Sequence, residues 1–297
     1  MITLSIIIPV GDIQRDEENL LRVINDFANL EKCELIIVFD FKLPNKISAI
    51  GTLQKIMDLS KEGIIKVAFS HGKGPNNARE EGQSLAMGAR ILFCDSDDMP
   101  RLREISVLLE EGESKGYTDV FSYYELREDL TLIARPANIF STIDFPGLWR
   151  VAIPIPIARV ATYCGGDLAE DIVLLIDVLL KSTQIRFRNI YLYTHVHHSR
   201  KRLSNQATEE RYYEAFESIL GIISSENMKL QKNHFVAVAL FYSLVISFFG
   251  VSSWQTRKEV LTKVCKLVFN NLSLLCMSLA IVPLVISRKI LKRIHEI

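Results

Sequence analysis

The first hundred residues alternate between short, continuous apolar runs and amphipathic segments. The apolar runs have the length of strands that are buried on both faces, and the amphipathic segments carry apolar residues at helical spacing. Strands that alternate with helices are joined by right-handed crossovers, so the pattern predicts a parallel sheet covered on both faces. The predicted strands are 4–9, 34–39, 64–69 and 89–94, and the predicted helices are 17–30, 45–60 and 76–87.

After residue 100 the alternation becomes less regular. Pro154 and Pro156 interrupt the apolar segment 149–161, which favours an edge strand or an extended stretch over a helix. The segment 135–146 has little periodicity and two prolines, as is typical of a loop over a site. The other predicted elements are a helix at 101–115, paired strands at 120–126 and 130–134, a turn at 164–167 and a helix at 170–181.

Three carboxylates occupy four consecutive positions, Asp95-Ser96-Asp97-Asp98, directly after the fourth predicted strand. Like charges this close repel one another and resist removal from water, so a cation usually accompanies them. Their oxygen-only donor set suits Mg²⁺ or Mn²⁺. The carboxyl end of a strand is also where α/β sheets bind ligands. A solvated loop that caps the following helix is the simpler alternative. The helix and strand before the loop favour a metal and a phosphate, and hence a nucleotide-binding first half.

A second acidic pair, Glu170-Asp171, begins the predicted helix 170–181. The apolar stripe of that helix places the pair at its amino end, beside Gly165 and Gly166 and facing the predicted site. Carboxylates at a helix amino terminus are also stabilised by the helix dipole, so a plain cap is an equal alternative on position alone.

Four segments together resemble the motifs of family 2 glycosyltransferases. They are the apolar run 5–10 with Pro9 near its end, the turn Ala78-Arg79-x-x-Gly82, the acidic loop 95–98 and the tripeptide Ala169-Glu170-Asp171. They follow the order and spacing of that family over about the first two hundred residues. The resemblance implies a GT-A fold, a Rossmann-like, mostly parallel sheet sandwiched by helices. It also implies a catalytic domain at 1–204, with a nucleotide-binding half at 1–100 and an acceptor half at 101–204.

The resemblance also implies a role for each acidic group. Asp97 and Asp98 match the family's metal ligands, and Asp95 matches its contact to the metal or the ribose. The ion would be Mn²⁺ or Mg²⁺, a Lewis acid on the departing diphosphate. Asp171 matches the general base that takes the proton of the acceptor hydroxyl, with Glu170 as the second candidate. Attack from the face opposite the leaving group inverts the anomeric carbon.

The implied donor is a nucleotide-diphosphate sugar. The residues predicted to contact it are Pro9, Asp40, Arg79, Asp95, Ser96 and His198. Arg79 lies where a cation could reach a phosphate, although an arginine on a helix is as often only solvated. His195, His197 and His198 occur where the family often has a histidine near the diphosphate or metal, and His198, before Ser199, matches best.

The segment after the second predicted strand departs from the family. Where the family usually has adjacent acids that hold the base and the ribose, this chain keeps only Asp40, between Phe39 and Phe41. Either phenylalanine could stack on a nucleobase, or it could belong to the core. The identity of the nucleotide therefore stays open.

The composition narrows the class of protein. Lys+Arg and Asp+Glu are balanced at 35 each, so no net field attracts nucleic acid. The five cysteines are scattered without a Cys-x-x-Cys pair, which argues against disulfides or a zinc site and for a reducing compartment. The apolar start lacks a basic leader and runs into acidic residues, so it is predicted to be a strand and not a signal peptide. We therefore expect the catalytic part in the cytoplasm.

The region 205–297 is predicted to be helical and unusually apolar. Its runs at 235–251 and 272–286 would be about 26 and 22 Å long as helices, shorter than the ~30 Å hydrocarbon core. Four basic residues follow each run, and a two-span hairpin would carry the first four across the membrane, against the positive-inside rule. Helices that lie in the interface, on the cytoplasmic face of a membrane, fit better. A packing subdomain or a homodimer interface is the alternative.

Together these features predict an inverting, metal-dependent transfer of a sugar to an acceptor hydroxyl. A lipid-linked glycan under assembly for a surface polysaccharide would explain the apolar tail. A sugar-nucleotide pyrophosphorylase is disfavoured, because residues 9–13 contain no glycine-rich, basic phosphate loop. A catalytically inactive, membrane-bound scaffold of the same fold is the remaining alternative. The lone Asp40 favours the scaffold, whereas Asp97 and Asp171 argue against it because a scaffold needs neither.

Overall fold

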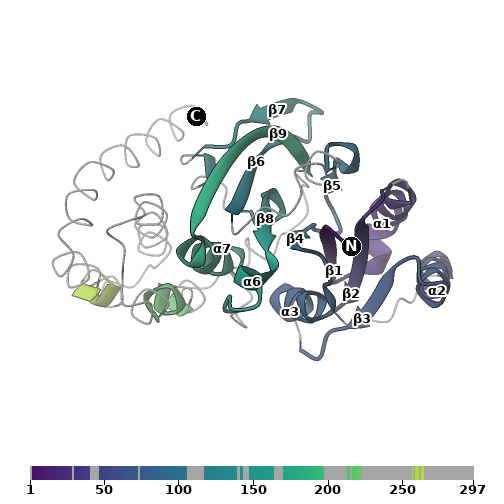
Figure 1. Cartoon of the computed structure of the whole chain (residues 1–297), viewed down its shortest axis with the longest axis horizontal. Coiled ribbons are helices and arrows are strands. Elements are labelled where there is room, and N and C mark those ends of the chain that lie inside the picture. Colours follow the sequence, from purple (N-terminus) through teal and green to yellow (C-terminus); the bar gives the residue numbers. More distant parts are fainter. Residues whose placement is uncertain are drawn as a thin grey trace. The chain divides into compact units, whose positions relative to one another are not determined.

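The chain divides into two compact units, Met1–Lys201 and Arg202–Ile297. The first unit holds the nine-stranded sheet (Figure 1). The computed structural model describes residues 2–28, 30–40, 47–72, 74–105, 117–138, 141–142, 147–163 and 170–196, and helical pieces at 213–214, 216–221, 256, 258–260 and 262–263.

Strands and helices alternate in the first half of the sheet, as the sequence predicts. The strands are β1 (Leu4–Val10), β2 (Cys33–Phe39), β3 (Lys66–Phe69) and β4 (Arg90–Phe93), and the helices are α1 (Ile13–Phe27), α2 (Ile47–Lys61) and α3 (Pro75–Leu85). The four strands are parallel, in the order β3-β2-β1-β4 (Figure 1). All of β1 and nearly all of β2 are buried, which explains their continuous apolar sequences.

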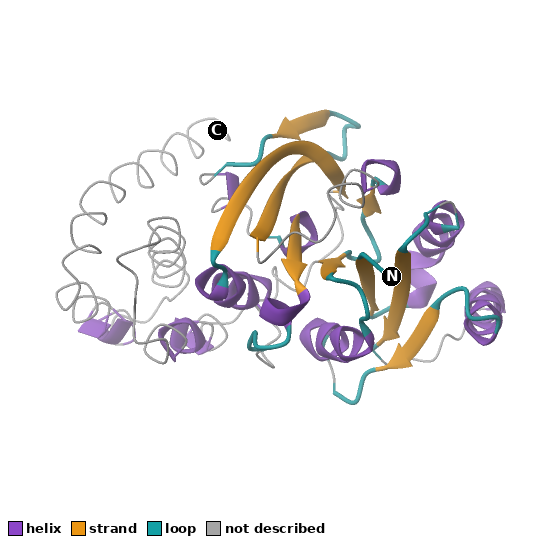
Figure 2. Ribbon diagram, viewed as in Figure 1, coloured by secondary structure: helices purple, strands orange, loops and turns teal. Residues whose placement is uncertain are grey.

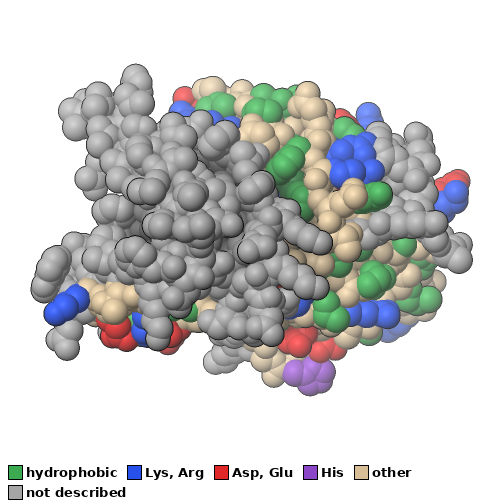
Figure 3. Space-filling view, turned by 60° about the vertical axis from the view of Figure 1, so that its left-hand side comes forward, with side chains coloured by type: hydrophobic (Ala, Val, Ile, Leu, Met, Phe, Trp, Pro, Cys, Tyr) green, Lys and Arg blue, Asp and Glu red, His purple; other side chains and the backbone are tan. Residues whose placement is uncertain are grey.

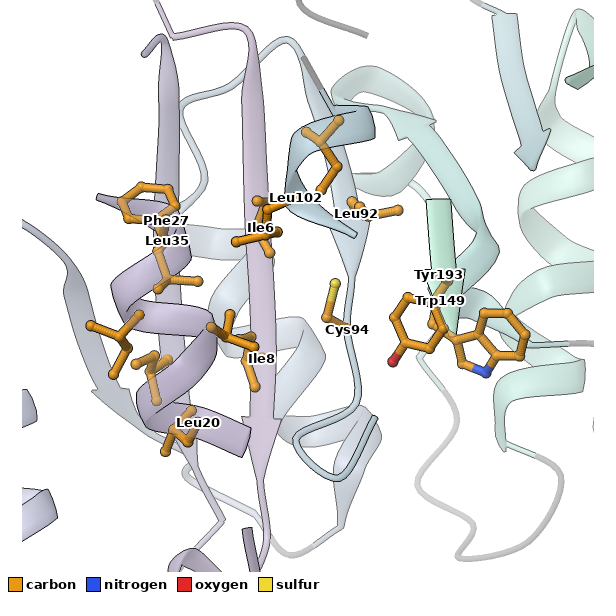
Figure 4. Packing of buried hydrophobic residues seen from close by; sticks show 14 of the residues in the cluster. Ile6, Ile8, Leu20, Phe27, Leu35, Leu92, Cys94, Leu102, Trp149 and Tyr193 are labelled. Atoms are coloured by element: carbon orange, nitrogen blue, oxygen red, sulfur yellow. The ribbon is translucent and has the colours of Figure 1, made fainter. Parts of the chain in front are cut away.

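Different helices cover the two faces of this parallel sheet. Ile6 and Ile8 of β1 share a buried cluster with Leu20 and Phe27 of α1 (Figure 4). The side chain of Ile7, between them, lies against α3 on the opposite face. Alternate residues of one strand therefore anchor opposite helical layers, and the prediction of a doubly covered sheet is confirmed.

The second half of the sheet continues from β4 with strands in mixed directions (Figure 2). Its elements are β5 (Met99–Pro100), β6 (Tyr117–Leu126), β7 (Leu132–Arg135), the 3₁₀ turn Leu148–Arg150, β8 (Val151–Pro154), α6 (Ile155–Ala158), α7 (Glu170–Lys181) and β9 (Gln184–Val196). From β4 the order is β8, β6, β9 and β5, and only the β6–β9 pair is parallel. β7 pairs with β6, so the predicted strand pair is confirmed.

The prediction for 149–161, an edge strand or an extended stretch and not a helix, is only partly confirmed, because residues 151–154 are extended but β8 is not an edge strand and α6 follows it. β8 lies between β4 and β6 and pairs with both. Pro154 is the last residue of the strand, and Pro156 falls in the first turn of α6, where an N–H has no partner within the helix. Because the prolines sit at the junction of strand and helix, neither interrupts the pairing of the strand.

The described surface carries charges of both signs. On the face drawn in Figure 3, Lys and Arg side chains are interspersed with Asp, Glu and hydrophobic side chains. Among the described residues, the most exposed large apolar side chains come from separate places: Met87 after α3, Leu130 in the β6–β7 turn and Val160 after α6.

The described residues of the second unit are helical. Nζ of Lys263 lies 2.7 Å from Oε1 of Glu217, and the hydroxyl of Tyr213 donates to Oε1 of Glu259 over 2.6 Å. These contacts join segments more than forty positions apart in the sequence. The second unit therefore has tertiary packing of its own.

The apolar runs 235–251 and 272–286 lie outside the described residues. In the part of the chain that the structure describes, none of the helices is both long enough and apolar enough to cross a bilayer. The predicted seat on a membrane stays a prediction.

Gly82 allows α3 to approach the sheet closely. A Cβ at this position would clash with Cγ2 of Ile7 and lie 3.1 Å from Cγ2 of Val38, and both of these side chains are fully buried. We therefore expect Gly82→Ala to lower the free energy of unfolding by about 1–3 kcal/mol, as overpacking of a core usually does.

Gly51→Ala is the matched control, because Gly51 also lies within a helix but has nothing within 4 Å of its Cβ position. This change should be neutral or stabilise the protein by up to about 1 kcal/mol. Urea denaturation followed by circular dichroism measures both effects. Equal effects of the two substitutions would contradict the close approach at Gly82.

Candidate functional site

The loops after β1, β2 and β4 meet at one edge of the sheet. Pro9 is buried within β1, Asp40 follows β2, and the acidic loop 95–98 follows β4. The N–H of Asp40 donates to the carbonyl of Val10 over 2.9 Å. The Asp40 carboxylate accepts a hydrogen bond of 2.7 Å from the N–H of Gly74. Asp40 therefore ties the end of β2 to the start of α3.

Strand β9 holds the acidic loop at both of its ends. The Asp98 carboxylate accepts hydrogen bonds from Nδ1 of His195, over 2.9 Å, and from the N–H of Val196, over 2.8 Å. At the other end, the N–H of Asp95 donates to the hydroxyl of Tyr193 over 2.9 Å. The short β5 that follows the loop also pairs with β9. A strand about a hundred positions later thus fixes the shape of the loop.

Helix α1 holds the same loop from its other side. Ser96, predicted to contact the donor, is buried and donates its hydroxyl hydrogen to Oδ2 of Asp16 over 2.6 Å. The side chain of Asn19 donates to the carbonyl of Asp97 over 3.1 Å. Nη2 of Arg15 lies 3.9 Å from Oδ2 of Asp97. The backbone of the loop is therefore held in place, while the Asp97 carboxylate is partly exposed and lies near the guanidinium of Arg15.

The three predicted metal ligands differ in exposure. The Asp97 side chain is 37% exposed, Asp95 is 27% exposed, and Asp98 is only 2% exposed. Within the described ranges, no three His, Cys, Asp or Glu side chains are grouped closely enough to hold a metal ion. The oxygens of Asp95 and Asp97 fit a hard divalent ion that completes its ligands with water or a bound diphosphate.

Arg79 joins the two acidic segments that the sequence singles out. Its Nη2 lies 3.2 Å from Oδ1 of Asp95, and its Nη1 lies 2.5 Å from Oδ1 of Asp171. Nη1 also donates to Oδ1 of Asn76 over 3.2 Å. The Arg79 side chain is 3% exposed, so it is not a solvated surface arginine. The fold brings Asp95 and Asp171 to different nitrogens of one guanidinium.

The surroundings of Asp95 make this carboxyl hard to ionise. Burial raises the pKa of Asp95 to about 7, against the opposing effect of the Arg79 guanidinium and with further repulsion from Asp171, Asp98 and Asp97. A divalent cation would relieve this repulsion and displace the proton. The electrostatics of the loop therefore favour a bound cation.

The two candidate bases occupy the first two positions of α7, whose bounds are those predicted from the sequence. Asp171 is half-buried and contacts Arg79. The side chain of Glu170 lies outside the described part of the structure, and so do the predicted turn and residues 164–169. The ranking of Asp171 over Glu170 stays a prediction.

His195 does not follow the strand, as the sequence suggested, but lies within β9. Its ring stacks on Trp149 with centroids 5.3 Å apart, and the Trp149 ring stacks on Tyr193 with centroids 4.6 Å apart. His195 is therefore packed in the core and bonded to Asp98. His197 and His198, including the predicted donor contact, lie outside the described residues.

Phe39 packs in the core of the first unit. It is buried in the main cluster, and its ring centroid lies 5.7 Å from that of Phe69 at an interplanar angle of 31°. Of the two alternatives that the sequence left open, Phe39 therefore belongs to the core. Phe41 lies outside the described residues.

Sequence reasoning missed the residues that support the site but lie far from it in the sequence. Asp16, Trp149 and Tyr193 position the acidic loop or its supporting strand, but each reaches it only through the tertiary fold. The sequence did contain one sign of this support. Tyr193 and His195 are two residues apart, so in a strand they lie on the same face and could contact one loop together.

The chain resembles known proteins both in sequence and in fold. The family model "Glycosyl transferase family 2" matches residues 5–155. S. aureus TarS 1-349 in complex with UDP-GlcNAc has a TM-score of 0.63 and 16% identity, over 82% of this chain and 73% of that chain. The same TarS fragment in complex with UDP has a TM-score of 0.59 and 16% identity, over 80% and 69%. At these identities the likeness concerns the fold. No curated protein matches the sequence.

The hydrogen bond between His195 and Asp98 should stabilise the folded protein. His195→Phe keeps a ring to stack on Trp149 but removes the donor to a buried carboxylate. We expect a loss of about 1–3 kcal/mol in the free energy of unfolding, the usual cost of a buried acceptor left without its partner. Urea denaturation provides the measurement.

His71→Phe is the matched control, because the His71 ring contacts Glu81 at an exposed position. Its effect should stay within about 0.5 kcal/mol, as for most surface changes. A loss at His195 no larger than that at His71 would mean that the bond to Asp98 does not stabilise the loop.

Proposed function

The chain belongs to glycosyl transferase family 2, and we propose that it is an inverting enzyme that moves a sugar from a nucleotide-diphosphate donor to an acceptor hydroxyl. The observation that supports this function best is the contact of Arg79 with both Asp95 and Asp171. Asp95, a proposed donor contact, and Asp171, the candidate base, lie far apart in the sequence but both contact Arg79. A fold maintained only as a scaffold would not require this meeting.

The proposed donor site lies beyond the carboxyl ends of β1, β2 and β4. Its side chains are those of Asp40, Arg79, Asp95 and Asp97, with Pro9 in the adjoining strand and His198 from the segment after β9. Ser96 would act indirectly, through its bond to Asp16. UDP is the first nucleotide to test, because TarS, whose fold is similar, has been solved with UDP and with UDP-GlcNAc.

Asp97 and Asp95 would hold a divalent ion, Mn²⁺ or Mg²⁺. Their side chains are partly exposed, whereas the Asp98 carboxylate is buried in its bonds to His195 and Val196. When bound, the ion would neutralise the charge that develops on the departing diphosphate. We assign Asp98 the role of positioning the loop in place of the direct ligation that the motif suggests.

Asp171 would accept the proton of the acceptor hydroxyl. As that proton leaves, the hydroxyl oxygen forms a bond to the anomeric carbon, and the bond between this carbon and the diphosphate oxygen breaks. Attack from the side opposite the diphosphate inverts the configuration. Glu170, the preceding residue, is the second candidate for the base.

The acceptor is proposed to be a glycan, and more narrowly a lipid-linked glycan at the cytoplasmic face of a membrane. The support is the sequence pattern of the last third, with two apolar runs and four basic residues after each. Basic side chains beside apolar helices are attracted to anionic lipid. A packing or homodimer element is the alternative use of the same region.

Asp97→Ala should abolish the metal-dependent part of nucleotide binding, because it removes the most exposed carboxylate of the acidic loop. Titration calorimetry with UDP, in Mn²⁺ and in EDTA, measures this. Asp58→Ala, which removes an exposed carboxylate on the distant helix α2, is the matched control and should leave the affinity unchanged. Unchanged affinity in Asp97→Ala would mean that the acidic loop is only a cap.

Asp171→Asn should separate binding from transfer. The amide keeps the size of the side chain but cannot take a proton, so donor binding should survive. The rate of transfer should fall roughly 10²–10⁴-fold, the usual contribution of a general base. Transfer assays on Asp171→Asn and Glu170→Gln decide between the two acids. A near-normal rate in the first variant and a large loss in the second would make Glu170 the base.

The full chain should float with anionic liposomes, and high salt should weaken this binding only in part, since salt screens the charges but not the apolar contact. A chain ending at Asn233 should stay unbound and still bind UDP, because every proposed donor contact precedes that residue. Flotation in a density gradient provides the measurement. A full chain that ignores liposomes would favour the packing or homodimer alternative.

A further inference from the structure

Arg79 contacts groups that the proposed reaction uses at different moments. Asp95 belongs to the loop that would face the metal and the diphosphate, and Asp171 is the candidate base. We propose that the diphosphate of the donor competes with Asp171 for the guanidinium of Arg79, so that the base is released only when a donor is bound. This coupling rests on the proposed function and adds an order of events to it.

The guanidinium is less exposed than the two described carboxylates that it contacts. Nη1 of Arg79 lies 2.5 Å from Asp171, and Nη2 lies 3.2 Å from Asp95. The arginine is 3% exposed, whereas the carboxylates are 28% and 27% exposed. Among the described residues, these two carboxylates are therefore more accessible to solvent than the guanidinium, and an anion that replaces one of them would contact Arg79.

Asp171 is the partner that can be exchanged. The backbone of Asp95 is fixed by Tyr193, and the rest of its loop is fixed by β9 and α1. A metal ion would hold its carboxylate further. Asp171 lies in the first turn of α7 and would have no metal to hold it. Phosphate oxygens match the planar fork of a guanidinium as well as a carboxylate does, so a diphosphate is a competent rival for this contact.

The exchange has a chemical consequence at the base. Oδ1 of Asp171 is buried against Arg79 in an ion pair without a hydrogen bond of standard geometry, so an acceptor hydroxyl cannot reach that oxygen while the pair persists. When the diphosphate replaces Asp171 as the partner of Arg79, Oδ1 becomes free to accept the proton of the acceptor hydroxyl. The same exchange leaves the positive charge of Arg79 beside the diphosphate, whose bond to the anomeric carbon breaks. Without a donor, the base stays paired with Arg79.

The competing explanation is that Arg79 is a fixed support that holds Asp171 throughout the reaction. The two explanations differ in what happens to nucleotide affinity when the acid is removed. A fixed support loses a partner, so the site becomes less ordered and binding weakens or stays the same. Under competition, removal of the Asp171 charge removes a rival of the diphosphate for Arg79, and binding becomes tighter.

The test is a double-mutant cycle on UDP binding, measured by titration calorimetry in Mn²⁺. The four proteins are the full wild-type chain, Asp171→Asn, Arg79→Gln and the double variant. We expect Asp171→Asn to tighten UDP binding by about 3–10-fold, the lower part of the range for groups in direct contact. In the Arg79→Gln background the same change should alter the affinity less than about 2-fold.

Glu80→Gln is the matched control for charge, because Glu80 is an exposed acid next to Arg79 on α3. It should not tighten binding. Equal tightening by Asp171→Asn in both Arg79 backgrounds, or equal tightening by Glu80→Gln, would mean that only net charge matters and would overturn the coupling. Unchanged or weaker binding in Asp171→Asn would overturn it in favour of a fixed support.

Further variants and a ligand without phosphate test the coupling even if a substitution at Arg79 prevents folding. If Arg79→Gln does not fold, Arg79→Lys replaces it, since one ammonium cannot span both acids. If neither folds, the comparison of Asp171→Asn with Glu80→Gln decides, with uridine as a ligand that lacks phosphate and should show no tightening. Failure of the wild type to bind either UDP or inorganic pyrophosphate with Mn²⁺ would instead overturn the proposed function, and the coupling with it.

Discussion

The guanidinium of Arg79 contacts two carboxylates that lie far apart in the sequence, one after a strand of the sheet and one on a helix. Asp95 comes from the end of a parallel strand and Asp171 from the start of α7. Without a cation between them, these acids would repel each other in a poorly hydrated place, where Asp95 already resists ionisation. The site can therefore assemble only if α3, which carries Arg79, is fixed in place, and Gly82 provides the close contact with the sheet that fixes it.

The second constraint is the hold of β9 on the acidic loop. Tyr193 binds the first residue of the loop and His195 binds the last, while the Trp149 ring stacks against both of their rings. Support from rigid elements lets a loop keep several like charges in a set geometry before any ligand binds. This support explains why the three acids of the loop differ in exposure. Asp98 is buried in bonds that hold the loop, whereas Asp95 and Asp97 stay partly exposed.

The sequence by itself determined the class of fold and the positions of its first seven elements. Buried parallel strands are apolar along their length, and the helices between them bury one stripe, so each element has a pattern that neighbouring residues reveal. The bounds of α7 and the hairpin of β6 and β7 followed from the same local patterns. The acidic loop was also visible, because adjacent charges after an apolar strand are a local feature.

Only the tertiary structure decided how these local features combine. It placed β8 in the middle of the sheet in spite of its prolines, buried Arg79 between Asp95 and Asp171, and committed Asp98 to His195. Each of these contacts joins residues far apart in the chain, and the partner of a charged side chain depends on which strands become neighbours. A single sequence states which groups are available for pairing, but the order of the strands decides which of them meet.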